Sequence, residues 1–322
     1  MTFESVKALA TPDLREVDRV IRERLASDVV LVNQVAEYIV GSGGKRLRPL
    51  VVVMAAQACG SRDNRHAEAA AIIEFIHTAT LLHDDVVDGS TLRRGRDTAN
   101  TVWGNEASVL VGDYVYSRAF EMMVALGSMQ IMDVMATATN KIAEGEVLQL
   151  MNAHDPDTTE ERYFEVIYRK TAKLFEAGTQ IAAILAGASP QLEASMARYG
   201  RHLGTAFQLV DDSLDYRADQ AQLGKNLGDD LAEGKPTLPL IYALKNGSDQ
   251  EREIIRLAIQ EGSAADLQRI TTAIESTGGL AYTARLARRE ATAAIEALAD
   301  LPESAYKQAL KDLADFAVDR TY

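Results

Sequence analysis

The amino-acid sequence predicts an all-α protein, a bundle of about 10–13 helices that forms one domain over residues 1–322. Aromatic residues make up only 6% of the chain although 47% of it is hydrophobic. The core must therefore rely on Ala, Leu, Ile, Val and Met, which suits helices packed on helices. Apolar residues also recur at helical spacing, as in the stripe Ile72, Phe75, Ile76, Ala79 and Leu82. No alternating β pattern bounded by hairpin turns competes with this interpretation.

The proline positions outline the individual helices. Proline breaks a helix interior, and all seven prolines lie at the edges of apolar-periodic stretches. We therefore expect helices over residues 13–40, 49–59, 66–88, 106–127, 129–152, 159–187, 190–216, 236–246, 250–260, 264–276, 279–300 and 303–319. No Gly/Ser linker divides the chain, and the candidate functional motifs are scattered from residue 43 to residue 235. A division into two domains would split the site, so one domain is predicted.

The charge balance narrows the classes of partner. The formal net charge is −13, and an acidic surface repels phosphate backbones, which argues against nucleic acid. A phosphorylated ligand must then be held by a local basic cluster or through a metal ion. The N-terminus has no apolar stretch long enough for a signal peptide, and no run of about 18 apolar residues predicts a spanning helix. With a single cysteine and no intramolecular disulfide, we expect a cytoplasmic protein without stable membrane insertion.

The motif HDDVVDGSTLRRG is the sharpest feature of the sequence. Asp84, Asp85 and Asp88 end a long apolar helix, and Gly89 is a typical helix stop. Asp84 and Asp88 are four residues apart, so their carboxylates share one helical face. Three acids at this end of a helix are electrostatically unfavourable because the macrodipole there is already negative. A bound cation would relieve that repulsion.

The same spacing recurs in FQLVDDSLDY, where Asp211, Asp212 and Asp215 follow another apolar run. Either motif alone is more often a solvated acidic helix end, but identical spacing after two apolar helices favours a shared role. Six carboxylates favour a hard divalent ion such as Mg²⁺, which completes its shell with water and substrate phosphate.

Basic residues lie near both acidic motifs. Arg93 and Arg94 follow the first one, and GSGGKRLRP supplies Lys45, Arg46 and Arg48 before a helix that we expect to start at Pro49. Glycines let backbone amides approach an anion, and a helix start adds a favourable dipole. YRKTAKLF and GKNLGDDLAEGKPT extend the set, although each of these lysines alone is more often a solvated surface residue. The further candidates are Lys170, Thr171, Lys225 and Lys235.

In combination, GGKRLRP, LLHDDVVDGSTLRRG, GTAFQLVDDSLDY and GKNLGDDLAEGKPTLP resemble the polyprenyl synthetase family of trans-isoprenyl diphosphate synthases. The resemblance runs from about residue 30 to residue 245 and is closest to the long-chain members, those with an octaprenyl product of about C40 in particular, and it leaves C45 and C50 products open. It implies an isoprenoid synthase fold around a deep central cavity, and a homodimer. It also implies head-to-tail condensation of isopentenyl diphosphate with an allylic diphosphate, farnesyl diphosphate in particular, for a quinone side chain.

The resemblance also assigns roles to residues. Both aspartate triplets would bind about three Mg²⁺ ions on the allylic diphosphate. The allylic contacts would be Arg93, Lys170, Thr171, Gln208, Lys225 and Lys235. The isopentenyl diphosphate site would be Lys45, Arg48, His77 and Arg94, although a histidine on an apolar helix is more often a core residue. Ser213, between the ligands of the second motif, is unusual for long-chain members.

The mechanism that these roles imply follows from charge. Departure of diphosphate from an allylic carbon leaves a cation and a highly charged anion, which metal ions and Arg93 would neutralise. The isopentenyl double bond attacks the allylic carbon, and the departing diphosphate takes up the proton that is lost. Thr171 and Gln208 are candidates to stabilise the transient carbocation.

The residues upstream of Asp84 are expected to set product length. Ala79 and Thr80 lie about one turn, roughly 5 Å, below the first aspartates. Short-chain members place an aromatic side chain here, so two small residues predict a long product. The floor would lie deeper, at Met122, Met123, Met132 and Met135, for which plain core filling is equally reasonable.

Several alternatives remain open. A shorter-chain synthase making geranylgeranyl or farnesyl diphosphate, or a partner subunit of a heteromeric synthase, would share much of the sequence, although such subunits normally lack an acidic patch. A terpene cyclase or head-to-head synthase binds no isopentenyl diphosphate and would not need GGKRLRP. A di-iron helical protein is disfavoured because Glu74 and His77 form only one Glu-x-x-His pair.

Overall fold

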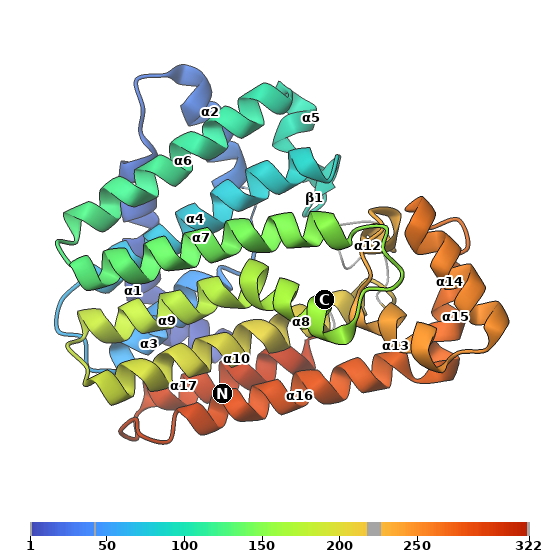
Figure 1. The fold of residues 1–322 in the computed structure, drawn as a ribbon. Coiled ribbons are helices and arrows are strands. Elements are labelled where there is room, and N and C mark those ends of the chain that lie inside the picture. The colour runs from blue at the N-terminus through green and yellow to red at the C-terminus, as the bar shows by residue number, and fades with distance from the viewer. Residues whose placement is uncertain (1, 42, 218–226, 321–322) are drawn as a thin grey trace. The chain divides into compact units, whose positions relative to one another are not determined.

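The computed structural model describes residues 2–41, 43–217 and 227–320, and within them the chain is almost entirely helical (Figure 1). The all-α prediction is therefore confirmed. The helices are α1 (Phe3–Leu25), α2 (Val30–Gly41), α3 (Leu47–Ala58), α4 (Arg65–Val87), α5 (Ala99–Trp103), α6 (Asn105–Ala125), α7 (Met129–Asn152), α8 (Glu160–Ile167), α9 (Lys173–Leu185), α10 (Pro190–Leu214), α12 (Asp229–Ala232), α13 (Leu238–Asn246), α14 (Asp249–Glu261), α15 (Leu267–Thr277), α16 (Gly279–Ala297) and α17 (Ala305–Asp319).

The helix expected over residues 13–40 is wrong, because α1 and α2 are separate. Ala26 adopts an extended conformation after α1, with φ −57° and ψ 132°. The side chain of Asn33 then holds the connection by accepting from the Ser27 N–H at 3.0 Å and donating to the Ser27 carbonyl at 2.7 Å. An amide side chain that satisfies a backbone N–H and C=O in this way competes with helix continuation.

The expectation that every proline lies at a helix edge is also wrong, since Pro12 lies inside α1. The helix begins earlier than predicted because Thr2 caps it, accepting from the Ser5 N–H at 3.2 Å. Proline removes one intrahelical N–H, but α1 is long and buries an apolar face that includes Val6, Val17 and Ile21. Tertiary packing therefore outweighs the local penalty.

Other elements depart from the prediction more locally. The helix expected over 159–187 consists of α8, a π-helical turn η1 (Tyr168–Ala172) and α9. The strands β1 (Leu92–Arg93) and β2 (Arg96–Asp97) form a short antiparallel ladder just after α4. α3 begins at Leu47 rather than Pro49. The short helices α5 and α12 were not predicted.

The chain divides into two compact units whose segments interleave along the sequence. Unit 1 comprises Met1–Thr139, Leu174–Gly200 and Ala297–Leu313; unit 2 comprises Asn140–Lys173, Arg201–Glu296 and Ala314–Tyr322. In unit 1, α4 is the central helix and packs against α1, α3 and α6 (Figure 1). Its residues from Ala69 to Ile76 are all buried, which explains its weak amphipathicity.

In unit 2, α13 packs against α14 and α15 around a core that includes Leu240, Ile255 and Ile274. A second apolar cluster lies beneath the end of α10 and includes Leu209, Leu214 and Leu238. These two cores support the part of unit 2 in which the second acidic motif lies, at the end of α10. Within the described ranges, no helix is both long and apolar enough to cross a membrane.

Candidate active site

The first acidic motif lies where α4 ends, as predicted. The helix stops at Val87, Asp88 is its C-cap residue, and Gly89 has a φ of +63°. Asp84 and Asp88 are half-buried on one face of the last turn, whereas the Asp85 side chain is fully buried. The three carboxylates therefore have different environments. Two lie at the surface of unit 1, and the third points inward.

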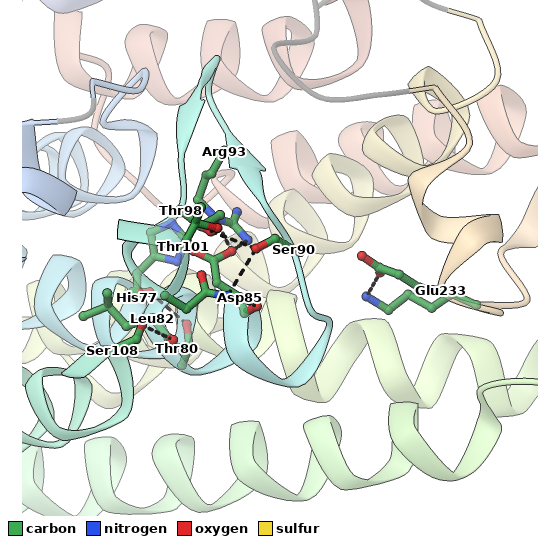
Figure 2. Close-up of polar contacts among 12 residues, drawn as sticks. His77, Thr80, Leu82, Asp85, Ser90, Arg93, Thr98, Thr101, Ser108 and Glu233 are labelled. Carbon is green, nitrogen blue, oxygen red and sulfur yellow. Dashed lines mark hydrogen bonds and ion pairs between the residues drawn. The ribbon is translucent and has the colours of Figure 1, made fainter. Parts of the chain in front are cut away.

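Asp85 anchors Arg93 on strand β1. The Arg93 guanidinium donates to Asp85 Oδ1 from Nε at 2.8 Å and from Nη2 at 2.6 Å (Figure 2). Burial raises the pKa of Asp85, and the Arg93 guanidinium partly offsets that rise. The other oxygen, Oδ2, is buried and has no hydrogen-bond partner among the described residues. Thr98 stabilises the segment that joins Asp85 to Arg93 by donating to the Ser90 carbonyl at 2.7 Å.

The glycine-rich segment before α3 contacts Arg94. Gly43 and Gly44 have φ values of +83° and +116°, and Arg46 is also left-handed. Arg94 donates from Nη1 to the Gly43 carbonyl. A Cβ added at Gly44 would lie 2.6 Å from the Arg94 guanidinium carbon. The glycines therefore let the backbone approach this arginine, whereas the approach of backbone amides to an anion stays a prediction.

His77 is desolvated and lies among positive charges, and both effects favour its neutral form. Arg48 donates from Nη1 to His77 Nε2 at 3.1 Å and packs over the Phe175 ring at 4.8 Å. Desolvation lowers the pKa of His77 well below its usual value, and the guanidiniums of Arg48, Arg94, Arg93 and Arg46 lower this pKa further. Unit 1 thus gathers three of the four residues predicted to bind isopentenyl diphosphate, Arg48, His77 and Arg94, into one electrostatic neighbourhood, which suits a diphosphate. The fourth, Lys45, is half-buried just before α3.

The residues predicted to set product length lie one turn further down α4. Ala79 is fully buried, and the half-buried Thr80 donates from Oγ1 to the His77 carbonyl at 2.8 Å (Figure 2). Met122, Met123 and Met135 are buried, and Met132 is half-buried. These positions fit both the predicted floor and simple core filling.

The second acidic motif lies at the end of α10 in unit 2. Asp212 and Asp215 are buried, whereas Asp211 is half-buried and pairs with Arg320 at 2.6 Å. The Arg320 guanidinium also donates to the Phe207 carbonyl at 2.6 Å and lies 3.7 Å from the centre of the Phe207 ring. Sequence reasoning missed this contact, because the C-terminal region carries only a weak family resemblance.

Asp212 is the most strongly perturbed carboxylate of the motif. Burial, together with repulsion from Asp230, raises the pKa of Asp212 to about 7. Tyr163 donates to Oδ2 at 2.5 Å, and Gln208 Nε2 donates to Oδ1 at 2.7 Å. Thr171 in turn donates to Gln208 Oε1 at 2.9 Å. A cation would lower the cost of this buried negative charge.

These groups line a cavity of about 150 Å³ in unit 2. Five of its lining residues are ones that the sequence predicted: Lys170, Thr171, Gln208, Asp212 and Lys235. Others were missed, notably Tyr163, Thr158, Asn152 and Asp230. Asp230 lies within the motif GDDLAEGK, which was available as a signal. Nothing in the sequence pointed to Tyr163, which lies 49 residues before its partner.

The cavity lysines carry carboxylate partners. Lys170 donates from Nζ to Glu146 Oε2 at 2.6 Å. Lys235 pairs with Glu233, which is labelled in Figure 2. Lys225 lies outside the described residues. Each of these two ammonium groups at the cavity therefore has a carboxylate partner.

The carboxylates at both helix ends provide hard oxygen donors, the ligand type that Mg²⁺ prefers. No set of three or more His, Cys, Asp and Glu side chains in the described ranges is arranged to hold a metal ion by itself. Mg²⁺ commonly uses one or two carboxylates and completes its shell with water and substrate phosphate. Residues such as Asp84 and Asp88 fit that pattern.

Comparison with known proteins gives three findings. The family model described as polyprenyl synthetase matches residues 29–276. Octaprenyl diphosphate synthase of Escherichia coli is 54% identical over 99% of both chains, and that of Haemophilus influenzae is 51% identical over 100% of this chain and 98% of its own. The structure of a polyprenyl synthase from Caulobacter crescentus, complexed with calcium and isoprenyl diphosphate, has a TM-score of 0.96 and 46% identity, covering 100% of this chain and 98% of its own.

Proposed function

The chain belongs to the polyprenyl synthetase family, and from this premise we propose that it is a magnesium-dependent trans-polyprenyl diphosphate synthase. It extends an allylic diphosphate, farnesyl diphosphate as the starter, by head-to-tail addition of isopentenyl diphosphate. The product is about C40 and supplies a quinone side chain. We further propose that residues 1–322 act as one polyprenyl synthetase domain in the cytoplasm.

One observation carries this proposal. The cavity of unit 2 brings Lys170, Lys235 and Asp212 together with the Thr171–Gln208 pair. Ammonium groups, a buried carboxylate of raised pKa and oriented neutral oxygens are what an allylic diphosphate with its metal ion requires. In unit 1, the neutral His77 beside Arg48 and Arg94 supports a separate site for the metal-free isopentenyl diphosphate.

The roles of the residues follow from these contacts. Asp84, Asp88, Asp211, Asp212 and Asp215 would hold Mg²⁺, which when bound supplies Lewis-acid neutralisation of the leaving diphosphate. Arg93, which Asp85 orients, and the two cavity lysines neutralise the remaining charge on the departing group.

The carbocation is handled by neutral oxygens. The Thr171 hydroxyl donates a hydrogen bond to Gln208 Oε1, so the remaining lone pairs of both side-chain oxygens can face the positive allylic carbon. Gln208 is itself fixed by its bond to Asp212. The proton that is lost in the last step goes to the departing diphosphate.

Association into a homodimer is part of the proposal. Large aliphatic side chains are exposed along α5 and α6, with Leu110 67% and Val124 65% exposed and Val102 and Val109 nearby in the sequence. Exposed apolar residues in series favour burial against a second copy. Sedimentation velocity should give a dimer, and Leu110→Glu should shift the population towards monomer. A monomeric wild-type protein would contradict this part.

The function is tested by incubating the protein with farnesyl diphosphate, labelled isopentenyl diphosphate and Mg²⁺, followed by chromatography of the dephosphorylated product. We expect a product of about C40 and loss of incorporation with Asp84→Asn. Products of C15 or C20 would favour the short-chain alternative. No incorporation with metal present would return the choice to a partner subunit of a heteromeric synthase.

A further inference from the structure

The π-helical turn η1 carries two residues that line the cavity, Lys170 and Thr171, and α7 packs against this turn. In η1 the Lys173 N–H donates to the Tyr168 carbonyl, five residues back, instead of four as in an α-helix. This widened turn interrupts an otherwise continuous helical segment between α8 and α9. A turn of this kind needs support, because its geometry is less favourable than that of an α-helix.

Gly145 of α7 lies directly against the turn. A Cβ added there would lie 2.7 Å from the Lys170 backbone nitrogen and 3.0 Å from the Arg169 carbonyl carbon. These are backbone atoms, so the turn itself would have to move. Glycine is less favourable than alanine in a helix interior, and this close approach explains why glycine occupies the position.

The residues on either side of Gly145, Glu144 and Glu146, form ion pairs with two neighbouring side chains of η1. Glu144 pairs with Arg169, which is also bound by Glu165 at 2.6 Å. Glu146 accepts from Lys170 Nζ at 2.6 Å. Three consecutive residues of α7 therefore grip two consecutive residues of η1, with one ion pair on each side of a backbone contact.

We infer that Glu144, Gly145 and Glu146 are positioning residues that set the placement of Lys170 and Thr171 for the allylic diphosphate. The inference rests on the proposed function for the identity of that ligand. None of these three residues belongs to the sequence motifs that predicted the active site. Their effect should be confined to the allylic substrate, because the predicted isopentenyl diphosphate contacts lie in unit 1.

Gly145→Ala is the first test. The added methyl group displaces η1, so we expect the KM for farnesyl diphosphate to rise at least about tenfold while the KM for isopentenyl diphosphate stays within about twofold. Ala143→Ser, an exposed change two residues earlier on α7, is the matched control and should leave both values unchanged. Equal rises in both KM values, or none, would overturn the inference.

Because Gly145→Ala could fold poorly, the outer ion pair offers a second test. Glu144→Arg and Arg169→Glu each place like charges together and should weaken binding of inorganic pyrophosphate, measured by calorimetry with Mg²⁺. The double variant restores an opposite-charge pair and should recover most of the affinity. Failure of the double variant to recover binding contradicts the inference, whereas wild-type protein that incorporates no isopentenyl diphosphate contradicts the proposed function instead.

Discussion

His77 is a residue whose charge state is dictated by its neighbours. Its ring is desolvated and faces several guanidiniums, so its pKa lies well below the usual 6.5. A neutral ring can accept a hydrogen bond from Arg48, which leaves that guanidinium oriented for an anion. The histidine therefore acts as a neutral spacer among cations.

This lowered pKa makes stability depend on pH in a defined direction. Below about pH 6.5, the unfolded chain protonates His77 while the folded protein does not, so stability falls as pH falls. His77→Gln keeps a hydrogen-bond acceptor for the Arg48 guanidinium and removes the side chain that titrates in this pH range. From pH 7 to pH 5, the wild type should lose more unfolding free energy than the variant, by at most about 2 kcal/mol, as measured by urea denaturation. Equal losses would contradict the assignment.

Ala79 is the residue predicted to decide, at single-residue scale, whether the product can grow past the helical turn of α4 that lies below the first aspartates. It is fully buried, so Ala79→Phe fills whatever space a tunnel offers. We expect products shortened to about C15–C20, since one helical turn is close to one isoprene unit. Chromatography of the products measures this, with Ala79→Ser as the small-residue control. An unchanged product length together with a loss of about 1–3 kcal/mol of stability would indicate plain core packing instead.

At the scale of elements, helix ends and turns carry most of the site. The glycine-rich segment before α3 and the ladder of β1 and β2 meet where Arg94 contacts Gly43 and Gly44. Two neighbouring glycines there differ in one respect. Both have positive φ, but only a Cβ at Gly44 would collide with the guanidinium, whereas a Cβ at Gly43 would meet no atom within 4 Å.

That difference allows a paired prediction. Gly44→Ala adds backbone strain and pushes Arg94 aside, so the KM for isopentenyl diphosphate should rise about tenfold or more. Gly43→Ala introduces the same kind of strain with open space around the new methyl group and should change this KM much less. Steady-state kinetics of both variants distinguishes them. Equal effects would mean that strain, rather than Arg94, accounts for the loss.

Sequence reasoning succeeded for these elements where the signal was local. Helical periodicity and glycine predicted the end of α4, and thus the shared face of Asp84 and Asp88. The sequence did not predict that the Asp85 side chain is buried. Residue spacing indicates the direction in which a side chain points along a helix, but not how much of the rest of the protein covers it. The turn η1 was missed because it spans only five residues, too few for a change of helical period to be detected in the apolar pattern.

At the scale of the whole molecule, the proposal requires that both aspartate motifs act on one diphosphate. Residues that act as a unit have strongly non-additive effects on rate. Asp84→Asn and Asp211→Asn should each lower kcat by about a thousandfold, and the double variant should be little worse than the poorer single one. Multiplication of the two losses in single-turnover assays would mean that the motifs act independently.

The interleaved make-up of the two units has a consequence for biosynthesis. Unit 1 includes Ala297–Leu313, and the Leu310 carbonyl of this segment accepts from the buried Tyr199 hydroxyl at 2.8 Å. Unit 2 includes Ala314–Tyr322, which contributes Arg320. Domains generally fold as units while the chain is being synthesised. Here both units include part of α17, so a nascent chain cannot complete either unit until α17 has left the ribosome. The apolar faces of the earlier helices stay exposed to solvent until then, and we expect chaperones to bind them.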